Sequence, residues 1–458
     1  MKTEKITVNE LFSGIGAQVS ALERLGIPCE IKHTSDIDHN AVLAYASIHC
    51  GLTEDLINTY AEYPAREEMA RQLTEVNLGY DFQKNKPYNW YRFVNSKSKE
   101  LEKYWLANKL SRNLGDISKL EHLDYADFWT YSFPCTDISV AGKQEGIKQG
   151  QTRSGLLYEV QRLLERANQM LTLPKYLMLE NVKNLVGKKF KPQFDEWVAW
   201  LDELGYNTYW KVLNAKDYGV PQNRERVFAI SIRKDIDNGK FEFPQPFDNG
   251  IRLKDVLENS VDEKYYLTGT MIRDFINYNE NYTASETNRC IQMGSLSGSK
   301  WDKMFEISRR YYSTKGIAPT IHTSGGGNQG PKIAEPIAYV KEATKKGYAE
   351  IYEGDSVNLE QPNSKTRRGR VGKGCVQTLT TSCNQGIVES KAKSFGVRKL
   401  TPRECYRLMG FKDEQFDKAQ QFSSDSQLYK QAGNSIVVDV LYYIFEKIFM
   451  NMERDTNI

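Results

Sequence analysis

The chain lacks the patterns that mark secreted, disulfide-stabilised and membrane-spanning proteins. It has seven cysteines, an odd number, and no Cys-x-x-Cys pair, so we expect neither a disulfide framework nor a zinc site. The N-terminal segment MKTEKITVNELFSG has no apolar core or cleavage site typical of a signal peptide. No apolar run approaches the roughly 18 residues needed to cross a membrane. These absences predict a cytoplasmic protein with no metal site and no membrane contact.

A large excess of either charge is also missing. The 458 residues include 62 basic and 59 acidic side chains, a net charge of +3, so any surface for nucleic acid would have to be local. Aromatic residues make up 12% of the chain, which suits nucleic-acid contact and ordinary cores equally. The length is ample for two domains.

Strands and helices alternate through residues 1–245. The segment EKITVNELFSGIGAQVSALERLGI is typical of a strand, a glycine turn and a helix. Further strands are predicted in YADFWTYSFP, PKYLMLENV and RERVFAISIR, and an amphipathic helix in GLLYEVQRLLERANQML. We therefore predict an α/β domain with a mostly parallel sheet over residues 1–245, interrupted by a helical insert at about 52–110.

The composition changes after about residue 245. Residues 246–396 are rich in Gly, Ser, Thr and Asn, which predicts a smaller domain of strands and loops. Within it, the segments that begin KGIAPTIHTS and KGCVQTLTTS both continue to NQG. They indicate two related units, although turn-rich segments also resemble each other by chance. Helical character returns over 397–458, and we expect its apolar last helix to pack back on the first domain.

Three predicted strand ends carry residues suited to a nucleoside ligand. Gly14 and Gly16 follow the first strand and allow the backbone to approach a ligand closely. Asp36 follows the second strand, where an acid can accept hydrogen bonds from ribose hydroxyls, and Asp116 ends another. Val19 stands where a dinucleotide fingerprint has its third glycine, so a full nicotinamide fingerprint is absent.

A second group of residues suits covalent chemistry. Cys135 follows Pro134 at the exit of a predicted strand, where a thiolate would face a cleft, although free cysteines are commonly buried in cores. Glu180 ends an apolar strand. Arg224 and Arg226 lie two apart at the start of another strand and should point to one face. A nucleophile, a carboxyl group and two guanidinium groups would suit a polar, planar substrate.

The motifs FSGIGA, FPC, ENV, QNRER and GNS, in this order, resemble those of the DNA (cytosine-5)-methyltransferases of bacteria and phages. The resemblance extends over residues 5–50, 113–232 and 397–445. It implies a Rossmann-like S-adenosylmethionine-dependent methyltransferase domain, with residues 246–396 as the target-recognition domain. The implied reaction transfers a methyl group from S-adenosylmethionine, leaving S-adenosylhomocysteine, to C5 of a cytosine flipped out of a specific duplex DNA sequence.

The resemblance also implies a set of cofactor-binding residues. Asp36 would bind the ribose in place of the more usual Glu, and Ile37 would cover the adenine in place of the more usual Trp. Asp116 would accept a hydrogen bond from the adenine amine. The full implied set is Phe12, Gly14, Ile15, Gly16, Asp36, Ile37, Asp116, Ile117, Pro134, Leu156, Asn434 and Ser435.

Catalytic roles follow from the resemblance in the same way. Cys135 would add to C6 of the cytosine, and Glu180 would hold or protonate N3 as the thiolate adds. Arg226 would contact the cytosine O2, and Arg224 would orient the loop or a phosphate. The segment TDISVAGKQEGIKQGQTRSG, after Cys135, would close as a lid over the flipped base.

Residues predicted to contact DNA lie in the lid and in the target-recognition domain. The basic run KTRRGRVGK is a candidate for phosphate or guanine contact, with a solvated loop as the alternative. The predicted contacts are Lys143, Gln144, Thr320, Arg367, Arg368, Arg370, Thr378 and Thr380. The expected partner is double-stranded DNA, bound by a monomer in a bacterial or phage-infected cell. A cognate restriction endonuclease is a candidate second partner.

Two alternatives stay open at this point. Some relatives of this family methylate tRNA with the same motifs, so an RNA cytosine-5 methyltransferase is one of them. The turn-rich middle region favours duplex DNA over this alternative. The other is a DNA-binding protein that keeps the fold without turnover, against which the intact Cys135, Glu180 and Arg226 argue.

Overall fold

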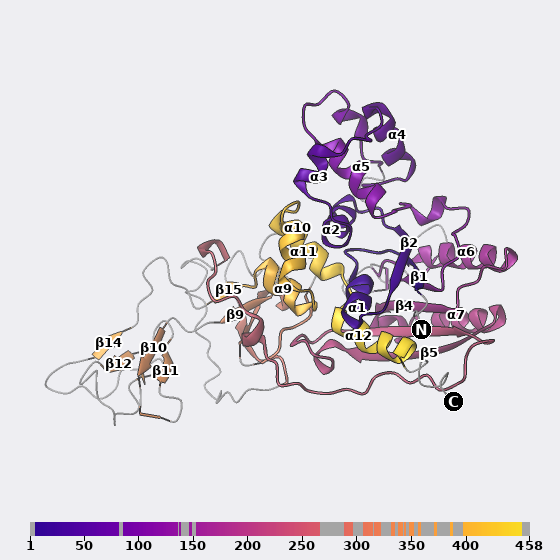
Figure 1. Ribbon diagram of the computed structural model, residues 1–458. Helices are drawn as coiled ribbons and strands as arrows, with labels where there is room; N and C mark the ends of the chain where they lie inside the picture. Colours follow the sequence, from indigo (N-terminus) through magenta and orange to yellow (C-terminus); the bar gives the residue numbers. More distant parts are fainter. Residues whose placement is uncertain are drawn as a thin grey trace. The chain divides into compact units, whose positions relative to one another are not determined.

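The computed structural model describes most of the chain in two compact units (Figure 1). The described residues are 5–81, 86–135, 137–138, 146–148, 153–265, 288–295, 306–314, 316–321, 331–334, 338–341, 343–344, 348–351, 356–358, 371–372, 385–387 and 397–450. The first unit comprises Met1–Val220, Arg224–Asn249 and Tyr406–Ile458, and the second comprises Pro221–Asn223 and Gly250–Cys405. The predicted domain boundaries and the separate roles of the two domains stay predictions.

A six-stranded sheet organises the first unit. Its strands are β1 (Ile6–Leu11), β2 (Cys29–Ser35), β3 (Phe128–Tyr131), β4 (Tyr176–Val182), β5 (Tyr206–Asn214) and β6 (Glu225–Arg233). Their spatial order is β2-β1-β3-β4-β6-β5. The first four pair in parallel, whereas β6 runs antiparallel to both β4 and β5. The predicted α/β fold with a mostly parallel sheet is therefore confirmed.

Helices cover both faces of this sheet. The helices of the unit are α1 (Ala17–Leu25), α2 (His39–His49), α3 (Glu54–Thr59), α4 (Arg66–Glu75), α5 (Glu100–Leu110), α6 (Leu157–Gln169), α7 (Lys191–Leu204), α9 (Pro402–Leu408, shared with the second unit), α10 (Asp413–Gln420), α11 (Asp425–Asn434) and α12 (Val438–Phe445). Trp129 and Leu177 pack in one core with α6 and α7. The neighbouring Phe128 points to the other face, where its ring meets that of Phe445 in α12 at 5.5 Å between centroids. Such alternation is expected of a strand that is buried on both faces.

The range 52–110 contains α3, α4 and α5, which enclose a second core of aromatic and aliphatic side chains. Trp90 is fully buried in it and donates its indole N–H to the carbonyl of Leu78 at 2.9 Å. Val42 and Leu43 of α2 belong to the same core. The insert is thus attached to the sheet through α2, the helix that follows β2.

Short strands predominate among the described residues of the second unit. A four-stranded sheet has the order β15-β9-β8-β7, and a two-stranded and a three-stranded sheet have the orders β10-β11 and β13-β12-β14. The elements are β7 (Gln292–Ser295), α8 (Glu306–Arg309), β8 (Arg310–Ser313), β9 (Lys332–Ala334), β10 (Ala338–Lys341), β11 (Tyr348–Ile351), β12 (Ser356–Asn358), β13 (Val371–Gly372), β14 (Gln385–Ile387) and β15 (Val397–Lys399).

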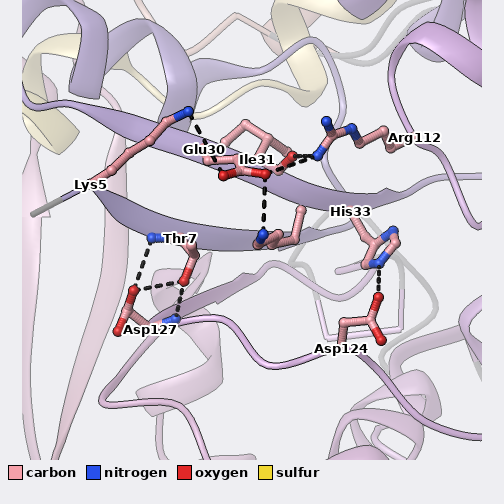
Figure 2. Close-up of polar contacts among 9 residues, drawn as sticks. Lys5, Thr7, Glu30, Ile31, His33, Arg112, Asp124 and Asp127 are labelled. Carbon is pink, nitrogen blue, oxygen red and sulfur yellow. Dashed lines mark hydrogen bonds and ion pairs between the residues drawn. The ribbon is translucent and has the colours of Figure 1, made fainter.

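Polar contacts tie the segment before β3 to β1 and β2 (Figure 2). The backbone N–H and the hydroxyl of Thr7 both donate to Asp127 Oδ2, at 3.0 and 2.6 Å, and the Asp127 N–H donates back to Thr7 Oγ1 at 2.9 Å. On β2, His33 Nε2 lies 2.9 Å from Asp124 Oδ2. These contacts help to fix the register of the parallel strands, so that the strands end together at their carboxyl edge.

Glu10 is a carboxyl group buried within the sheet. Its side chain in β1 is fully buried, and it accepts a hydrogen bond of 2.6 Å from the Tyr45 hydroxyl. Burial raises the pKa of Glu10 from 4.5 to about 7. A raised carboxyl pKa means that the folded protein keeps a proton that the unfolded chain has released. Folding therefore becomes less favourable as pH rises from 4.5 through about 7.

We expect Glu10→Gln to remove this pH-dependent loss of stability, because the amide keeps the shape of the side chain but does not ionise. At pH 8 the variant's free energy of unfolding should exceed that of the wild type by up to about 3 kcal/mol, from about 1.4 kcal/mol per pKa unit. At pH 5 the two should agree within about 1 kcal/mol. Urea unfolding at both pH values measures the difference, with Glu165→Gln on the exposed side of α6 as the control. Parallel pH profiles for wild type and Glu10→Gln would contradict it.

Candidate active site

The loop after β1 turns sharply at three residues. Phe12, Gly14 and Gly16 have positive φ values of 57°, 56° and 79°. A Cβ on Gly16 would lie 2.6 Å from the ring of His49, so only glycine fits there. A Cβ on Gly14 would meet nothing within 4 Å. The loop therefore presents its backbone to open space at Gly14, as a ligand cradle requires.

Asp36 follows β2 and joins this loop. Its Oδ2 accepts a hydrogen bond from the Gly14 N–H at 2.9 Å, and its Oδ1 accepts one from the Asp38 N–H at 2.8 Å. Burial, together with the Asp38 carboxylate, raises the pKa of Asp36 from 3.8 to about 6. Asp38 itself pairs with Lys430 of α11 at 2.6 Å. Each Asp36 oxygen keeps lone-pair capacity for a hydroxyl donor.

Asp116 lies in the loop that neighbours Asp36. Its Oδ2 accepts from Asn77 Nδ2 at 2.7 Å, and its Oδ1 accepts from the N–H and the hydroxyl of Ser118 at 3.0 and 2.7 Å. The side chain of Asn113 joins the two loops, because it accepts from the Asp36 N–H at 2.8 Å and donates to the Asp36 carbonyl at 2.9 Å. The two acids are thus held in adjacent loops at the carboxyl edge.

The segment that leads to Cys135 is held on both sides. Asn181 Nδ2, on β4, donates to the carbonyl of Phe133 at 2.9 Å. The Ser154 hydroxyl donates to the carbonyl of Pro134 at 2.7 Å. Cys135 therefore lies just beyond the end of β3 in a fixed turn, with its side chain partly buried.

The electrostatic surroundings of Cys135 combine one carboxyl group and two guanidinium groups. Burial raises the pKa of the Cys135 thiol, Arg226 lowers it, Glu180 raises it and Arg224 lowers it. Glu180 is 7% exposed at the carboxyl end of β4 and pairs with Arg226, Nε to Oε1, at 3.2 Å. Burial raises the pKa of Glu180 as well, against the effect of both arginines. The structure therefore brings together all four residues predicted for catalysis, and their roles stay predictions.

The placement of Arg224 differs from the sequence prediction. Because β6 begins at Glu225, Arg224 lies before the strand, and strand alternation does not determine its direction. Its side chain is 3% exposed, and its Nη2 donates to the carbonyls of Gly433 and Ser435 at 3.0 and 2.9 Å. Burial lowers the pKa of Arg224 to about 9. These contacts favour a role in holding the C-terminal end of α11 over contact with a phosphate.

The other predicted residues lie at varied depths. Ile15, Ile117 and Ser435 are buried, Ile37, Pro134 and Leu156 are partly buried, and Asn434 is exposed at the end of α11. Thr320 is described, and its hydroxyl donates to the Asn223 carbonyl at 2.6 Å. The predicted DNA contacts Lys143, Gln144, Arg367, Arg368, Arg370, Thr378 and Thr380 lie outside the described residues, as does most of the predicted lid.

Sequence reasoning missed four residues that hold the site together: Asn77, Asn113, Asn181 and Lys430. Asn181 had a detectable signal, because an amide inside an apolar strand needs a hydrogen-bond partner. The other three gave none. Their contacts join positions far apart in the chain. Asn77 and Asp116 are 39 positions apart, and Asp38 and Lys430 are 392 positions apart.

The arrangement can do two chemical tasks at one edge of the sheet. The glycine loop and the two acids can hold a nucleoside, and the thiol with its buried carboxyl neighbour can attack and protonate a polar ring. Both groups lie at the carboxyl ends of the strands, where open α/β sheets bind ligands. Within the described residues, no group of three or more His, Cys, Asp or Glu side chains could hold a metal ion. No helix in that part of the chain has the length and apolar character to cross a membrane.

Comparison with known proteins adds independent findings. A family model described as C-5 cytosine-specific DNA methylase matches residues 81–450. The type II methyltransferase M2.ScrFI of Lactococcus lactis subsp. cremoris is 34% identical over 451 residues, which cover 97% of this chain and 99% of that protein. The orphan methyltransferase M.SssI of Spiroplasma monobiae is 35% identical over 344 residues, which cover 73% of this chain and 83% of that protein. The solved structure of the Entamoeba histolytica methyltransferase EhMeth shares the fold with a TM-score of 0.50 at 15% identity. The match covers 98% of this chain and 99% of that one.

Proposed function

The chain belongs to the C-5 cytosine-specific DNA methylase family and is a DNA (cytosine-5)-methyltransferase, and we propose that it acts through Cys135 on a cytosine flipped out of duplex DNA. One observation carries this proposal. The Cys135 thiol, in a fixed turn, lies within electrostatic reach of the buried Glu180 and of its partner Arg226. A nucleophile and a carboxyl group held together in this way suit addition to a pyrimidine ring.

We propose S-adenosylmethionine as the cofactor, on which enzymes of this family and fold depend in general. The residues present fit it. Gly14 faces open space, Asp36 can accept hydrogen bonds from the ribose hydroxyls, and Asp116 can accept one from the purine amine. When bound, the cofactor supplies a methyl group carried on a positively charged sulfur.

The proposed mechanism begins at Cys135. Its thiolate forms a bond to C6 of the cytosine. The electrons of the C5–C6 double bond shift toward C4, and those of the C4–N3 double bond shift to N3, which gives an enamine that is nucleophilic at C5. Burial raises the pKa of Glu180, which favours the protonated carboxyl group that would share its proton with N3 as the ring gains electron density. After C5 has received the methyl group, a base removes the C5 proton, the bond between C6 and sulfur breaks, and the thiolate is released.

The two arginines have different parts in this proposal. Arg226 pairs with Glu180, and its guanidinium group would contact the O2 atom of the same ring. Arg224 holds the carbonyls of Gly433 and Ser435 and so acts as a positioning residue. Since the target atoms are inaccessible in stacked DNA, the base must flip out, at a cost of a few kcal/mol.

We propose a place in restriction–modification for the enzyme. One relative that matches nearly the whole chain, at 34% identity, is called a type II methyltransferase. Another, which matches as much of the chain at 28% identity, is called an orphan methyltransferase. The higher identity to the type II enzyme favours the first of these two roles. A cognate endonuclease would then be the partner in the cell, and a monomer acting in the cytoplasm suffices for a reaction on one base.

Bisulfite sequencing of DNA from a methylation-deficient bacterial host that expresses the chain tests the function. We expect one cytosine within one short sequence to resist conversion, and DNA from cells with the empty vector to convert fully. Labelled methyl transfer to duplex DNA and to tRNA, measured side by side with the purified protein, should favour duplex DNA. Complete conversion in every sequence context, despite abundant folded protein, would contradict the proposal. Transfer to tRNA alone would replace DNA with RNA as the substrate.

A further inference from the structure

The segment Val76–Gly79 links α4 to the rest of the insert and contacts two loops at the carboxyl edge. The Gly79 N–H donates to the carbonyl of Ile37 at 2.6 Å, and the Asp116 N–H donates to the carbonyl of Val76 at 3.0 Å. The segment therefore bridges the loop after β2 and the loop that carries Asp116.

The core of the insert fixes the position of this segment. Leu78 is 1% exposed, and its carbonyl accepts the indole N–H of the fully buried Trp90 at 2.9 Å. The Leu78 N–H donates to the carbonyl of Leu73 at the end of α4, at 3.0 Å. The bridge is consequently anchored in the insert, and the two loops rest against it.

The contact between the segment and the Asp116 loop is made by backbone against backbone. A Cβ on Gly115 would lie 1.9 Å from the carbonyl oxygen of Val76, and Gly115 has a φ of +73°. No side chain fits between these two backbone segments at this point. Such a close approach leaves the loop little freedom to shift relative to the insert.

Asn77 adds a side-chain contact to this bridge. Its backbone is left-handed, with φ 58°, a conformation that Asn adopts more readily than most residues. Its Nδ2 donates to Asp116 Oδ2 at 2.7 Å, while Ser118 donates to Oδ1. Both oxygens of the Asp116 carboxylate are therefore oriented, one of them by the insert.

We infer that Val76–Gly79 is a positioning element of the cofactor site and that Asn77 orients Asp116 toward the exocyclic amine of the purine. The inference rests on the proposed cofactor role of Asp116. A carboxylate held in one orientation accepts a hydrogen bond from a 6-amino group and opposes a 6-oxo group, because two acceptors then face each other. Asn77 thereby contributes to the choice of adenine over hypoxanthine, and this gives the insert a function.

The variant Asn77→Gly tests the inference, because glycine adopts the left-handed backbone without strain and only the amide is lost. Calorimetric titration with S-adenosylhomocysteine and with its 6-oxo analogue, S-inosylhomocysteine, gives a Kd for each ligand. We expect Asn77→Gly to weaken the adenosyl ligand about tenfold and the inosyl ligand less than about twofold. Leu171→Gly is the matched control, since Leu171 also has a left-handed backbone, at φ 55°, and is 92% exposed. It should change neither Kd.

The outcomes separate this inference from the proposed function. A folded wild type that binds neither ligand would overturn both. The inference alone would be overturned if the wild type prefers the adenosyl ligand and Asn77→Gly prefers it by the same ratio of Kd values. An equal increase of both Kd values in Asn77→Gly would give that result. If Asn77→Gly fails to fold, Asn77→Asp keeps the left-handed conformation accessible and replaces the donor with an acceptor. Asn77→Asp should reduce the preference for the adenosyl over the inosyl ligand at least as much as is expected of Asn77→Gly. An unchanged preference would again overturn the inference.

Discussion

Cys135→Ser should lower the rate of methyl transfer to duplex DNA by a factor of at least about 10³, with the affinity for S-adenosylhomocysteine within about twofold of the wild type. The serine hydroxyl ionises far less readily than a thiol and is a poorer nucleophile. In the wild type, the guanidinium groups of Arg226 and Arg224 oppose the effect of burial on the thiol pKa. The two guanidinium groups therefore assist the release of a proton from the thiol. They cannot ionise the serine hydroxyl in the same way, because a hydroxyl releases its proton far less readily.

Single-turnover transfer of a labelled methyl group measures this loss, and calorimetric titration measures the retained binding. Cys29→Ser is the matched control, because Cys29 is also a partly buried free cysteine, on β2, and burial raises its pKa to about 11. The control should keep the wild-type rate. A Cys135→Ser variant with more than about a tenth of the wild-type rate would be incompatible with a thiolate nucleophile at this position.

Glu180→Gln should lower the rate by about 10² to 10³-fold, with the affinity for DNA changed less than about fivefold. The amide fills the same space at the end of β4 but can neither hold nor release the proton that N3 requires. Since burial raises the pKa of Glu180, the wild-type rate should fall at high pH as this carboxyl group ionises. The variant has no such group and should lose that part of the pH profile.

Rates measured from pH 6 to 9 for both proteins test this expectation. Glu225→Gln is the control, because Glu225 is the neighbouring exposed carboxylate on β6 and pairs with Lys183 at 2.9 Å. It should behave as the wild type. A Glu180→Gln variant with a normal rate, or with the same fall at high pH, would assign the proton to another group.

The strand ends that carry the site could be predicted from the sequence. Gly14, Asp36, Cys135 and Glu180 each lie near the carboxyl end of a segment predicted as a strand, and parallel strands place such positions at one edge. Hydrophobic pattern and turn chemistry are local signals, so they survive in a single sequence. For the same reason the α/β fold followed from the alternation of strands and helices.

The direction of β6 and the placement of Arg224 could not be predicted in this way. The strand β6 lies between β4 and β5 and opposes both, which depends on pairing between distant segments. Arg224 is oriented by the carbonyls of Gly433 and Ser435, more than 200 positions along the chain. The contact of Asn77 with Asp116 is of the same kind. Such contacts have no local pattern, although they decide how the site is held.

Covalent capture on duplex DNA with 5-fluorocytosine at the target position tests the central claim most directly. Fluorine at C5 cannot leave as a proton does, so the adduct at C6 cannot break down after methyl transfer. We expect one adduct, dependent on S-adenosylmethionine, that peptide mass mapping assigns to Cys135 and that Cys135→Ser does not form. Methylation of ordinary DNA without any adduct on the fluorinated DNA, or an adduct on a different residue, would contradict the proposed mechanism.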